Sequence, residues 1–429
     1  MNITLLTWGS YGDVLPYVAF ALELQRNGHV VQFVTTPDFQ ELITQRGIKF
    51  KPLDCKTWDI DYSIFPDFEA LSIDYGCGCH QNPFVISRFF NRILIPFKDS
   101  FLPIIYDVCK GSEAIIFSPS AFPAYDVVEK LGIPSCVASV VPMHPTRAFP
   151  NHFTPSSLGL GSTYNWFSHI FFHQLFWQYT RQPINQWRQE MLNLPPISLF
   201  SYPLKRMNQQ KLPFLYGYSS AFLPKPTDWP DWTHITGYWF LDPVETWQPP
   251  VDLIKFLASG PPPVYIGFTS KGGWEPQYVR QIVLEALAIS GHRGILLKDE
   301  DVSNQIDLPD NIFQIEWVPF EWLFPRMSAV VHHGGCGTNA YALSAGVPSI
   351  IIPNNYDNFL WANRAAELGL GLPPIHRKEL SATTLAAAIT TVINDKNMQA
   401  KATDMAKQIQ AENGVKYAVE VFNSYLNSY

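Results

Sequence analysis

The pattern of hydrophobic and polar residues along this chain alternates between segments typical of strands and segments typical of helices. The apolar run 3–8 is followed by a loop with glycines, and the apolar residues of 17–25 recur at helical spacing. Another apolar run, 30–34, follows and indicates a second strand. Strand, glycine-containing loop, helix and strand in this order predict the beginning of a doubly wound α/β domain.

The same order returns further along the chain. Apolar runs at 113–118 and 132–137 flank a helical stretch, and those at 262–268 and 293–297 do so again after a stretch rich in proline and tryptophan, 221–250. A chain of 429 residues is too long for one core and suits two domains of about 200 residues each. We therefore expect two α/β domains joined by an extended connector that proline stiffens.

Composition narrows the classes of function. Charged residues make up 16% of the chain, below the usual fraction of about 25%, and aromatic residues 14%, which indicates unusual apolar surface or a large apolar cavity. The formal net charge of −7 argues against a nucleic-acid partner, which requires a basic footprint. The N-terminus has no basic region before its apolar run, so we expect a first strand there and no signal peptide.

Cysteine usage indicates a reducing compartment and no metal. The six cysteines lack a paired CxxC spacing, and free thiols in the cytoplasm are the expected state. The run Cys77-Gly78-Cys79-His80 could begin a zinc site, but no second cluster completes it. The pair Asp59 and Asp61 resembles the DxD motif of metal-dependent glycosyltransferases but lacks a neighbouring strand, so we expect no metal ion and no cofactor.

An uncharged aromatic stretch covers residues 150–180, which contain no Asp, Glu, Lys or Arg. A membrane-spanning helix needs about 20 mainly apolar residues, and polar residues such as Asn165, His169 and Gln174 interrupt this run. We therefore expect a helix that lines a cavity or touches a membrane at its periphery, and no transmembrane segment.

The strongest chemical signal lies between Val330 and Asn358, where strand, glycine-rich turn, helix, strand and polar loop follow one another. The N-terminus of such a helix presents unpaired N–H groups and about half a positive charge. The candidate ligands of a diphosphate there are the donor side chain of His333, the close-approach positions Gly334, Gly335 and Gly337, the backbone of Cys336, and the hydroxyl of Thr338. Asp357 and Asn358, beyond the next strand, would hold a polyhydroxylated group. A diphosphate site next to a site for a polyhydroxylated group predicts that this segment binds a nucleotide sugar.

These residues resemble the donor signature of GT-B nucleotide-sugar glycosyltransferases. The segments His332-His333-Gly334-Gly335-Cys336-Gly337-Thr338, Gly346-Val347-Pro348 and Pro353 to Asp357 match the UDP-glucosyltransferase-like family that includes sterol, glycopeptide and macrolide glycosyltransferases. The resemblance implies two facing Rossmann-like, doubly wound domains. It assigns 1–221 to an acceptor-binding domain, 222–250 to a linker, 251–410 to a donor-binding domain, and 411–429 to a helix that crosses back to the first domain.

The same resemblance implies further donor ligands. Ser270, in a loop where family members carry a serine, would contact donor phosphate. Trp317 and the backbone of Val318 would hold the nucleotide base, although the buried core is an alternative place for Trp317. Two departures leave the donor open: Tyr341 stands where uridine-using plant members have a glutamate, and Asn358 stands in the place of the usual glutamine.

The loop after the first strand is the second candidate for chemistry. Gly9-Ser10-Tyr11-Gly12-Asp13 through Pro16 fits the pattern of the sterol and antibiotic branch, in which Asp13 takes the place of the catalytic histidine of plant and animal members. We predict that Asp13 is the general base, with helix capping as its alternative role. The candidate acceptor-binding residues are Ser10, Phe84, Phe90, His144, Trp166 and Phe167.

The sequence thus predicts an inverting glycosyltransferase. It would move a hexose from a UDP- or TDP-sugar, with UDP-glucose favoured, to a hydroxyl of a hydrophobic small molecule or lipid of sterol, terpenoid, polyketide or phenolic type, and form a β-glycoside. The alternatives are a nucleotide-sugar epimerase or hydrolase of the same fold and a catalytically silent nucleotide-sugar-binding protein. We expect a cytoplasmic location, with peripheral membrane contact as a further hypothesis.

Overall fold

The computed structural model describes the whole chain except residues 54–100, 155–159, 244–246, 269–275, 299–307 and 355. It divides into two compact units. The described residues of the first run from Met1 to Leu241 and resume from Glu412 to Tyr429, and those of the second run from Asp242 to Ala411. The C-terminal helix therefore returns to the first unit, as the resemblance implied.

The first unit is built on a parallel sheet, whose described strands have the order β3-β2-β1-β4-β5-β6-β7. The strands are β1 (Asn2–Leu6), β2 (Val30–Thr35), β3 (Lys49–Pro52), β4 (Ala114–Phe117), β5 (Ser135–Ser139), β6 (Phe214–Tyr216) and β7 (Thr233–Ile235). The order reverses between β1 and β4, and the carboxyl ends of these two strands therefore form the topological switch point at which α/β proteins bind ligands.

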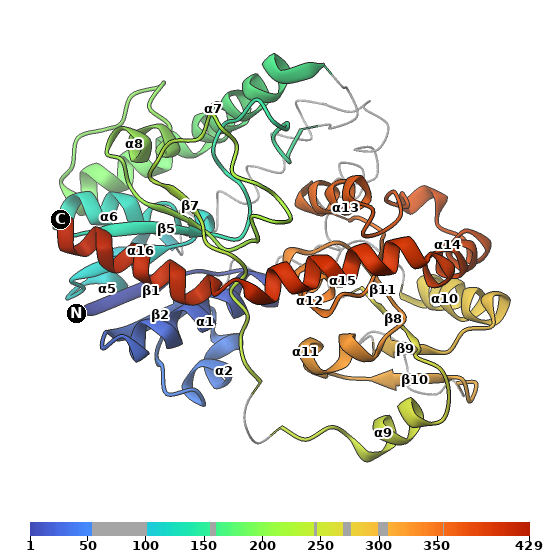
Figure 1. Cartoon of the computed structure of the whole chain (residues 1–429). Helices are drawn as coiled ribbons and strands as arrows, with labels where there is room; N and C mark the ends of the chain where they lie inside the picture. Colours follow the sequence, from blue (N-terminus) through green and yellow to red (C-terminus); the bar gives the residue numbers. More distant parts are fainter. Residues whose placement is uncertain (54–100, 155–159, 244–246, 269–275, 299–307, 355) are drawn as a thin grey trace. The chain divides into compact units, whose positions relative to one another are not determined.

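The first unit also contains helices, the first of which begins earlier than the apolar pattern predicted. They are α1 (Tyr11–Arg26), α2 (Gln40–Thr44), α5 (Leu102–Cys109), α6 (Ala124–Leu131), α7 (Gly161–Trp187), α8 (Pro203–Gln209) and α16 (Gly414–Ser428). α1 starts six residues before the predicted 17–25 because Ser10 and Asp13 cap it, and Pro16 lies inside it. α16 packs on α1 through a buried face that includes Ala418, Val419 and Phe422 (Figure 1).

The stretch expected to be an extended linker, 222–250, is in part a piece of the first sheet. β7 lies within it and pairs with β6, with Thr236 N–H donating to Tyr216 O at 2.9 Å. Trp229 and Trp239 are buried. These two tryptophans therefore belong to the core of the first unit. Their burial is the reason why a stretch that was predicted to be a linker from its proline content is part of the folded unit.

The second unit contains a smaller parallel sheet of order β10-β9-β8-β11-β12. Its strands are β8 (Val264–Gly267), β9 (Gly294–Leu297), β10 (Ile312–Ile315), β11 (Ala329–His332) and β12 (Ser349–Ile351). Val264 and Ile266 pack in the cluster on one face, and Tyr265 packs in the cluster on the other. The sheet is therefore covered on both faces, as in a doubly wound domain.

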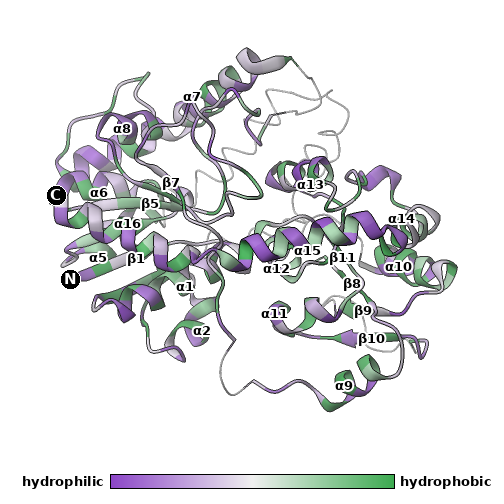
Figure 2. Cartoon of the chain, in the orientation of Figure 1, coloured by the Kyte–Doolittle hydropathy of each residue, from purple (hydrophilic) through white to green (hydrophobic). Residues whose placement is uncertain are grey.

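The helices of the second unit supply these two covers. They are α9 (Val251–Ala258), α10 (Pro276–Ser290), α11 (Phe320–Leu323), α12 (Cys336–Ala345), α13 (Tyr356–Leu368), α14 (Ala382–Asn394) and α15 (Lys396–Ala411). α10 and α14 pack together on the face of Val264, and α9, α11 and α12 contribute to the face of Tyr265. Figure 2 shows hydrophobic and hydrophilic residues interspersed along these helices, as expected where one face is buried.

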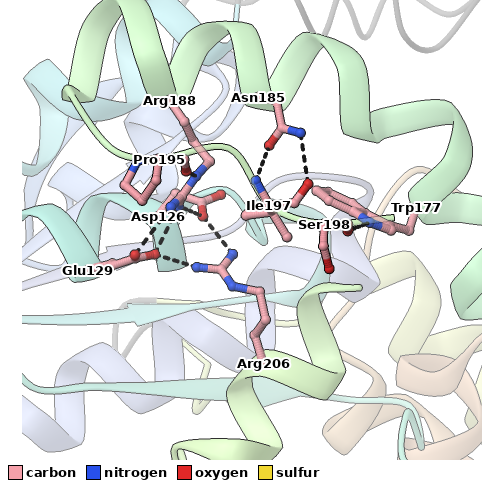
Figure 3. A network of polar contacts seen from close by, with 9 residues as sticks. All are labelled: Asp126, Glu129, Trp177, Asn185, Arg188, Pro195, Ile197, Ser198 and Arg206. Carbon is pink, nitrogen blue, oxygen red and sulfur yellow. Dashed lines mark hydrogen bonds and ion pairs between the residues drawn. The ribbon is translucent and has the colours of Figure 1, made fainter. Parts of the chain in front are cut away.

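A buried ionic network fixes the carboxyl end of α7 to α6 (Figure 3). Arg188, in a π-helical turn after α7, is 1% exposed and pairs with Asp126 and with Glu129, the latter at 2.9 Å. Arg206 from α8 pairs with the same two carboxylates. Arg188 and Asp126 are both buried, whereas Glu129 reaches solvent, so the buried pair at the centre of the network holds the end of α7 against α6. Across the described residues, no helix combines the length and apolarity needed to cross a bilayer.

Candidate active site

The glycine-rich loop after β11 lies at the switch point of the second sheet, where the strand order reverses between β8 and β11. Gly334 has φ +88°, a left-handed conformation that glycine adopts without strain. A Cβ atom there would lie 2.7 Å from Cγ2 of Ile351 and 3.1 Å from the carbonyl oxygen of Asn358. Gly334 therefore lets the loop approach the first turn of α13 closely, and the N-termini of α12 and α13 meet at this point.

The N-terminal turn of α12 presents the predicted anion-binding amides. Its first intrahelical bond runs from Asn339 N–H to Gly335 O at 3.0 Å, so the amides of Gly337 and Thr338 have no acceptor within the helix. The amide of Gly334 is already used, because it donates to Nδ1 of His332 at 3.1 Å. The helix begins at Cys336, directly after the glycine pair, and ends before Gly346, which has a left-handed conformation.

Both histidines of the loop are buried and neutral at neutral pH. Burial lowers the pKa of His332 to about 3 and that of His333 to about 4. Since Nδ1 of His332 accepts from Gly334, its proton lies on Nε2. Nδ1 of His333 has no hydrogen-bond partner among the described residues, and a Cβ atom at Gly335 would collide with Nε2 of the same ring. The His333 imidazole thus lies over the start of α12, where it can donate to an anion as a neutral ring.

Asp357 and Asn358 lie in the first turn of α13 and not in the polar loop that the sequence predicted. The correction has a physical reason, since an acidic residue in a first turn stabilises a helix there. Oδ1 of Asn358 accepts from Asn354 N–H at 3.3 Å, and Asn358 is 3% exposed, whereas Asp357 is half-buried. The more accessible carboxylate of Asp357 is therefore the better placed of the two to bind sugar hydroxyls.

Trp317 and Val318 follow β10 at the same edge of the sheet. Trp317 is 61% exposed, so the alternative that it belongs to the core is wrong. Val318 is buried in the cluster that contains Tyr265. An exposed indole next to an anchored residue can stack on a flat base. Tyr341, the departure in α12, packs edge-on against Phe320 at 6.0 Å between ring centroids.

In the first unit, Asp13 occupies the third position of α1, at the carboxyl end of β1. Its Oδ2 accepts from the amide of Ser10 at 2.8 Å and from the Ser10 hydroxyl at 2.9 Å. No described residue donates to Oδ1. Asp13 therefore caps the helix with one oxygen and keeps the other for a proton, so the two predicted roles are compatible.

The surroundings of Asp13 make it a stronger base than an ordinary aspartate. Solvent reaches part of the side chain, but nearby protein atoms displace enough water to raise its pKa above 3.8. The two hydrogen bonds from Ser10 act in the opposite direction and are the smaller effect. Ser10, predicted to bind acceptor, thus has a second role in holding the carboxylate.

His144 is part of the core, although the sequence placed it near the acceptor. It is 1% exposed, with Nδ1 at 2.6 Å from the hydroxyl of Tyr216 and Nε2 at 2.8 Å from Oδ1 of Asn208. Burial lowers its pKa to about 3. Both nitrogens are therefore occupied, which leaves neither for an acceptor hydroxyl.

Trp166 and Phe167 are exposed on α7 and remain acceptor candidates. Several other predicted residues lie outside the described part of the chain: Ser270, Phe84, Phe90, Asp59, Asp61, Cys77, Cys79 and His80. Within the part that is described, no three His, Cys, Asp or Glu side chains gather as metal ligands would.

Sequence reasoning missed Asn339, in the first turns of α12. Its side chain is 1% exposed, and in the part of the chain that the structure describes neither its amide nitrogen nor its oxygen has a hydrogen-bond partner. Such a group costs stability unless water or a ligand satisfies it. The available signal was its position directly after Thr338 in the glycine-rich signature.

Comparison with known proteins agrees with this geometry. Residues 3–150 match the glycosyltransferase family 28 N-terminal domain, and residues 281–420 match the C-terminal domain of erythromycin biosynthesis protein CIII-like proteins. The sterol 3-beta-glucosyltransferases of Neurospora crassa and Candida albicans are each 35% identical to this chain, over 98% and 99% of its length. The matched regions make up 27% and 28% of those relatives, so the chain spans only about a quarter of their length.

Solved structures share the fold across the whole chain. The calicheamicin glycosyltransferase CalG4 superposes with a TM-score of 0.69 at 16% identity, covering 100% of this chain and 98% of CalG4. The glycosyltransferase VinC in complex with dTDP gives 0.66 at 17% identity and covers 100% of both chains. Two parallel α/β sheets and a glycine-rich helix N-terminus thus define the GT-B class of glycosyltransferases. Within it, the chain belongs to the glycosyltransferases that join a glycosyltransferase family 28 N-terminal domain to an erythromycin biosynthesis protein CIII-like C-terminal domain.

Proposed function

We propose that this protein transfers a hexose, with inversion, from a nucleoside diphosphate sugar to a hydroxyl of a hydrophobic acceptor. The observation that carries the proposal is the convergence of the α12 and α13 N-termini at Gly334 and Asn358. Two helix N-termini at one point favour a bound diphosphate, and the adjacent carboxylate of Asp357 favours a sugar. The sterol glucosyltransferases among its relatives support a hydrophobic acceptor and glucose as the sugar.

In the proposed reaction, the acceptor hydroxyl gives its proton to Oδ1 of Asp13 and attacks the anomeric carbon. The bond between the anomeric carbon and the diphosphate oxygen breaks, and the diphosphate leaves with the electron pair. The amides of Gly337 and Thr338 and the neutral ring of His333 stabilise the charge that develops on this leaving group. Attack from the face opposite an α-linked diphosphate gives a β-glycoside.

The nucleotide is proposed to be UDP or TDP, with its base stacked on Trp317. Exposed Trp317 accommodates either base, and the dTDP complex of VinC shows that a relative in fold binds the thymidine nucleotide. Transfer is proposed to need no metal ion, because helix N-termini already supply positive charge to the diphosphate. Peripheral contact with a membrane is a further part of the proposal, since such an acceptor partitions into bilayers.

The test is an assay of sugar transfer in the presence of a chelator. Purified protein is incubated with UDP-glucose or TDP-glucose and with sterol, terpenoid, polyketide and phenolic acceptors, and the conjugate is analysed by mass spectrometry and proton NMR. A β-linked hexose on one acceptor class is expected. Donor consumption with no conjugate would instead favour a hydrolase or an epimerase, and donor binding with no turnover a silent binding protein.

A further inference from the structure

The first turns of α7 expose a set of large apolar side chains. Phe167 is 56% exposed and Phe171 49%, and their rings stack with centroids 6.2 Å apart. Trp166, on the same helix, is also exposed. This contrasts with the rest of α7, where Trp177 and Trp187 are buried. The surface consists of Leu160, Trp166, Phe167, Phe171, Leu199 and Phe200, and is called the α7 surface below.

Two of these residues come from a later loop that is fixed against α7. Gln174 and Gln178 each donate a side-chain N–H to the carbonyl oxygen of Leu199, at 2.8 and 3.1 Å. The indole N–H of Trp177 donates to the oxygen of Ser198 at 3.0 Å. Phe200, 67% exposed, is therefore held beside the helix, and the buried network of Arg188 fixes the end of that helix (Figure 3).

Cationic side chains accompany the α7 surface. Residues 141–210 contain five basic residues and one acidic residue, Glu190, but Arg188 and Arg206 pair with Asp126 and Glu129, which leaves Arg147, Arg181 and Lys205 as the cations outside that network. Two of the cations lie at the apolar residues themselves. The guanidinium of Arg147 lies over the ring of Trp166, and Nζ of Lys205 donates to Phe200 O at 3.2 Å. The nearby carboxylate of Asp228 accepts from the backbone of Arg147.

Exposed tryptophan and phenylalanine flanked by cations, with no charge between residues 150 and 180, match what the interface of a bilayer binds. We propose that the α7 surface docks on a bilayer that contains anionic lipid. This inference rests on the proposed function in one respect, since docking would bring the protein to a hydrophobic acceptor that is dissolved in that bilayer.

The test is flotation with vesicles of pure phosphatidylcholine and of phosphatidylcholine with phosphatidylglycerol. We expect the unaltered chain to float with the anionic vesicles and more weakly with the neutral ones. The double substitution Phe171→Ser and Phe200→Ser should abolish flotation. A control substitution of two comparably exposed residues of α10, Tyr278→Ser and Ile289→Ser, should leave it unchanged.

The cations give a second, independent readout. Replacing Arg147 and Lys205 by glutamine should weaken binding to anionic vesicles about fivefold for each charge. It should also remove most of the dependence of binding on salt. Binding to neutral vesicles should not change, because it rests on the apolar residues alone.

Assays of sugar transfer separate this inference from the proposed function. Phe171→Ser with Phe200→Ser should keep its rate on a water-soluble acceptor and lose rate on the same acceptor class embedded in vesicles. No flotation of the unaltered chain, or flotation that survives the double substitution, overturns the docking proposal. Sugar transfer to the water-soluble acceptor is unaffected by that outcome, and its absence would contradict only the proposed function.

Discussion

Ser10 holds Asp13 by two hydrogen bonds to a single oxygen, Oδ2, from its amide at 2.8 Å and from its hydroxyl at 2.9 Å. This arrangement orients the carboxylate at the start of α1 and leaves Oδ1 without a described donor. A carboxylate held in this way loses little orientational freedom when it accepts a proton. The relationship makes separate predictions for each of the two residues.

Asp13→Asn should remove the base while keeping the shape of the side chain. We expect kcat to fall about 10²- to 10⁴-fold, which is the usual contribution of general base catalysis. The Kd for the nucleotide sugar, measured by calorimetry, should stay unchanged, because the donor residues lie in the other unit. Normal turnover in this variant would show that Asp13 is only a cap.

Ser10→Ala should change the pH dependence of transfer. The base must be ionised, so kcat/KM falls as pH falls through the pKa of Asp13, which burial raises above 3.8. The Ser10 hydroxyl lowers that pKa, and its removal should therefore move the acidic limb of the profile to higher pH. A limb that moves to lower pH, or does not move, contradicts the assignment of this limb to Asp13.

Gly334→Ala should damage the donor site more than the fold. An alanine there adopts an unfavourable φ, at a cost of about 1–3 kcal/mol, and its Cβ collides with Ile351. We expect at least a tenfold weaker Kd for the donor, since the α12 and α13 N-termini are pushed apart. The matched control is Gly346→Ala at the other end of α12, also at positive φ, which should lower stability without changing donor affinity.

Arg188→Met should destabilise the first unit strongly. It leaves Asp126 buried with one of its two cationic partners removed, and breaking such a buried network costs about 3–5 kcal/mol. Arg26→Met is the control, because the side chain of Arg26 is 63% exposed and pairs with Glu23 of the same helix, so its loss should cost about 0–1 kcal/mol. Chemical denaturation followed by circular dichroism measures both. Equal effects would mean that the network in Figure 3 does not stabilise the unit.

Most of the order of strands and helices could be predicted because many strands are short apolar runs near glycine or proline. The strands β3, with the sequence Lys-Phe-Lys-Pro, and β7, with Thr-His-Ile, lack this pattern and were not predicted. The signature from His332 to Asp357 also predicted its own βαβ unit. Helix starts were harder, since α1 and α13 begin in polar residues whose capping contacts are not visible as periodicity.

Contacts between distant residues were the part that the sequence could not supply. The pairing of β7 with β6 depends on tryptophans that reach a core built elsewhere in the chain. The burial of His144 depends on Tyr216 and Asn208, more than sixty residues away. Asn339 could be noticed in the signature, but only the structure shows that its side-chain amide is buried and that no described residue forms a hydrogen bond with it.

The central claim is tested most directly by the product formed when the protein, a chelator, a nucleotide hexose and a hydrophobic alcohol are combined. We predict one conjugate that carries a single β-linked hexose, formed by the unaltered chain and reduced at least a hundredfold in Asp13→Asn. An α-linked product would contradict inversion. Free hexose as the only product, or no consumption of any nucleotide sugar, would contradict the assignment of sugar transfer to this site.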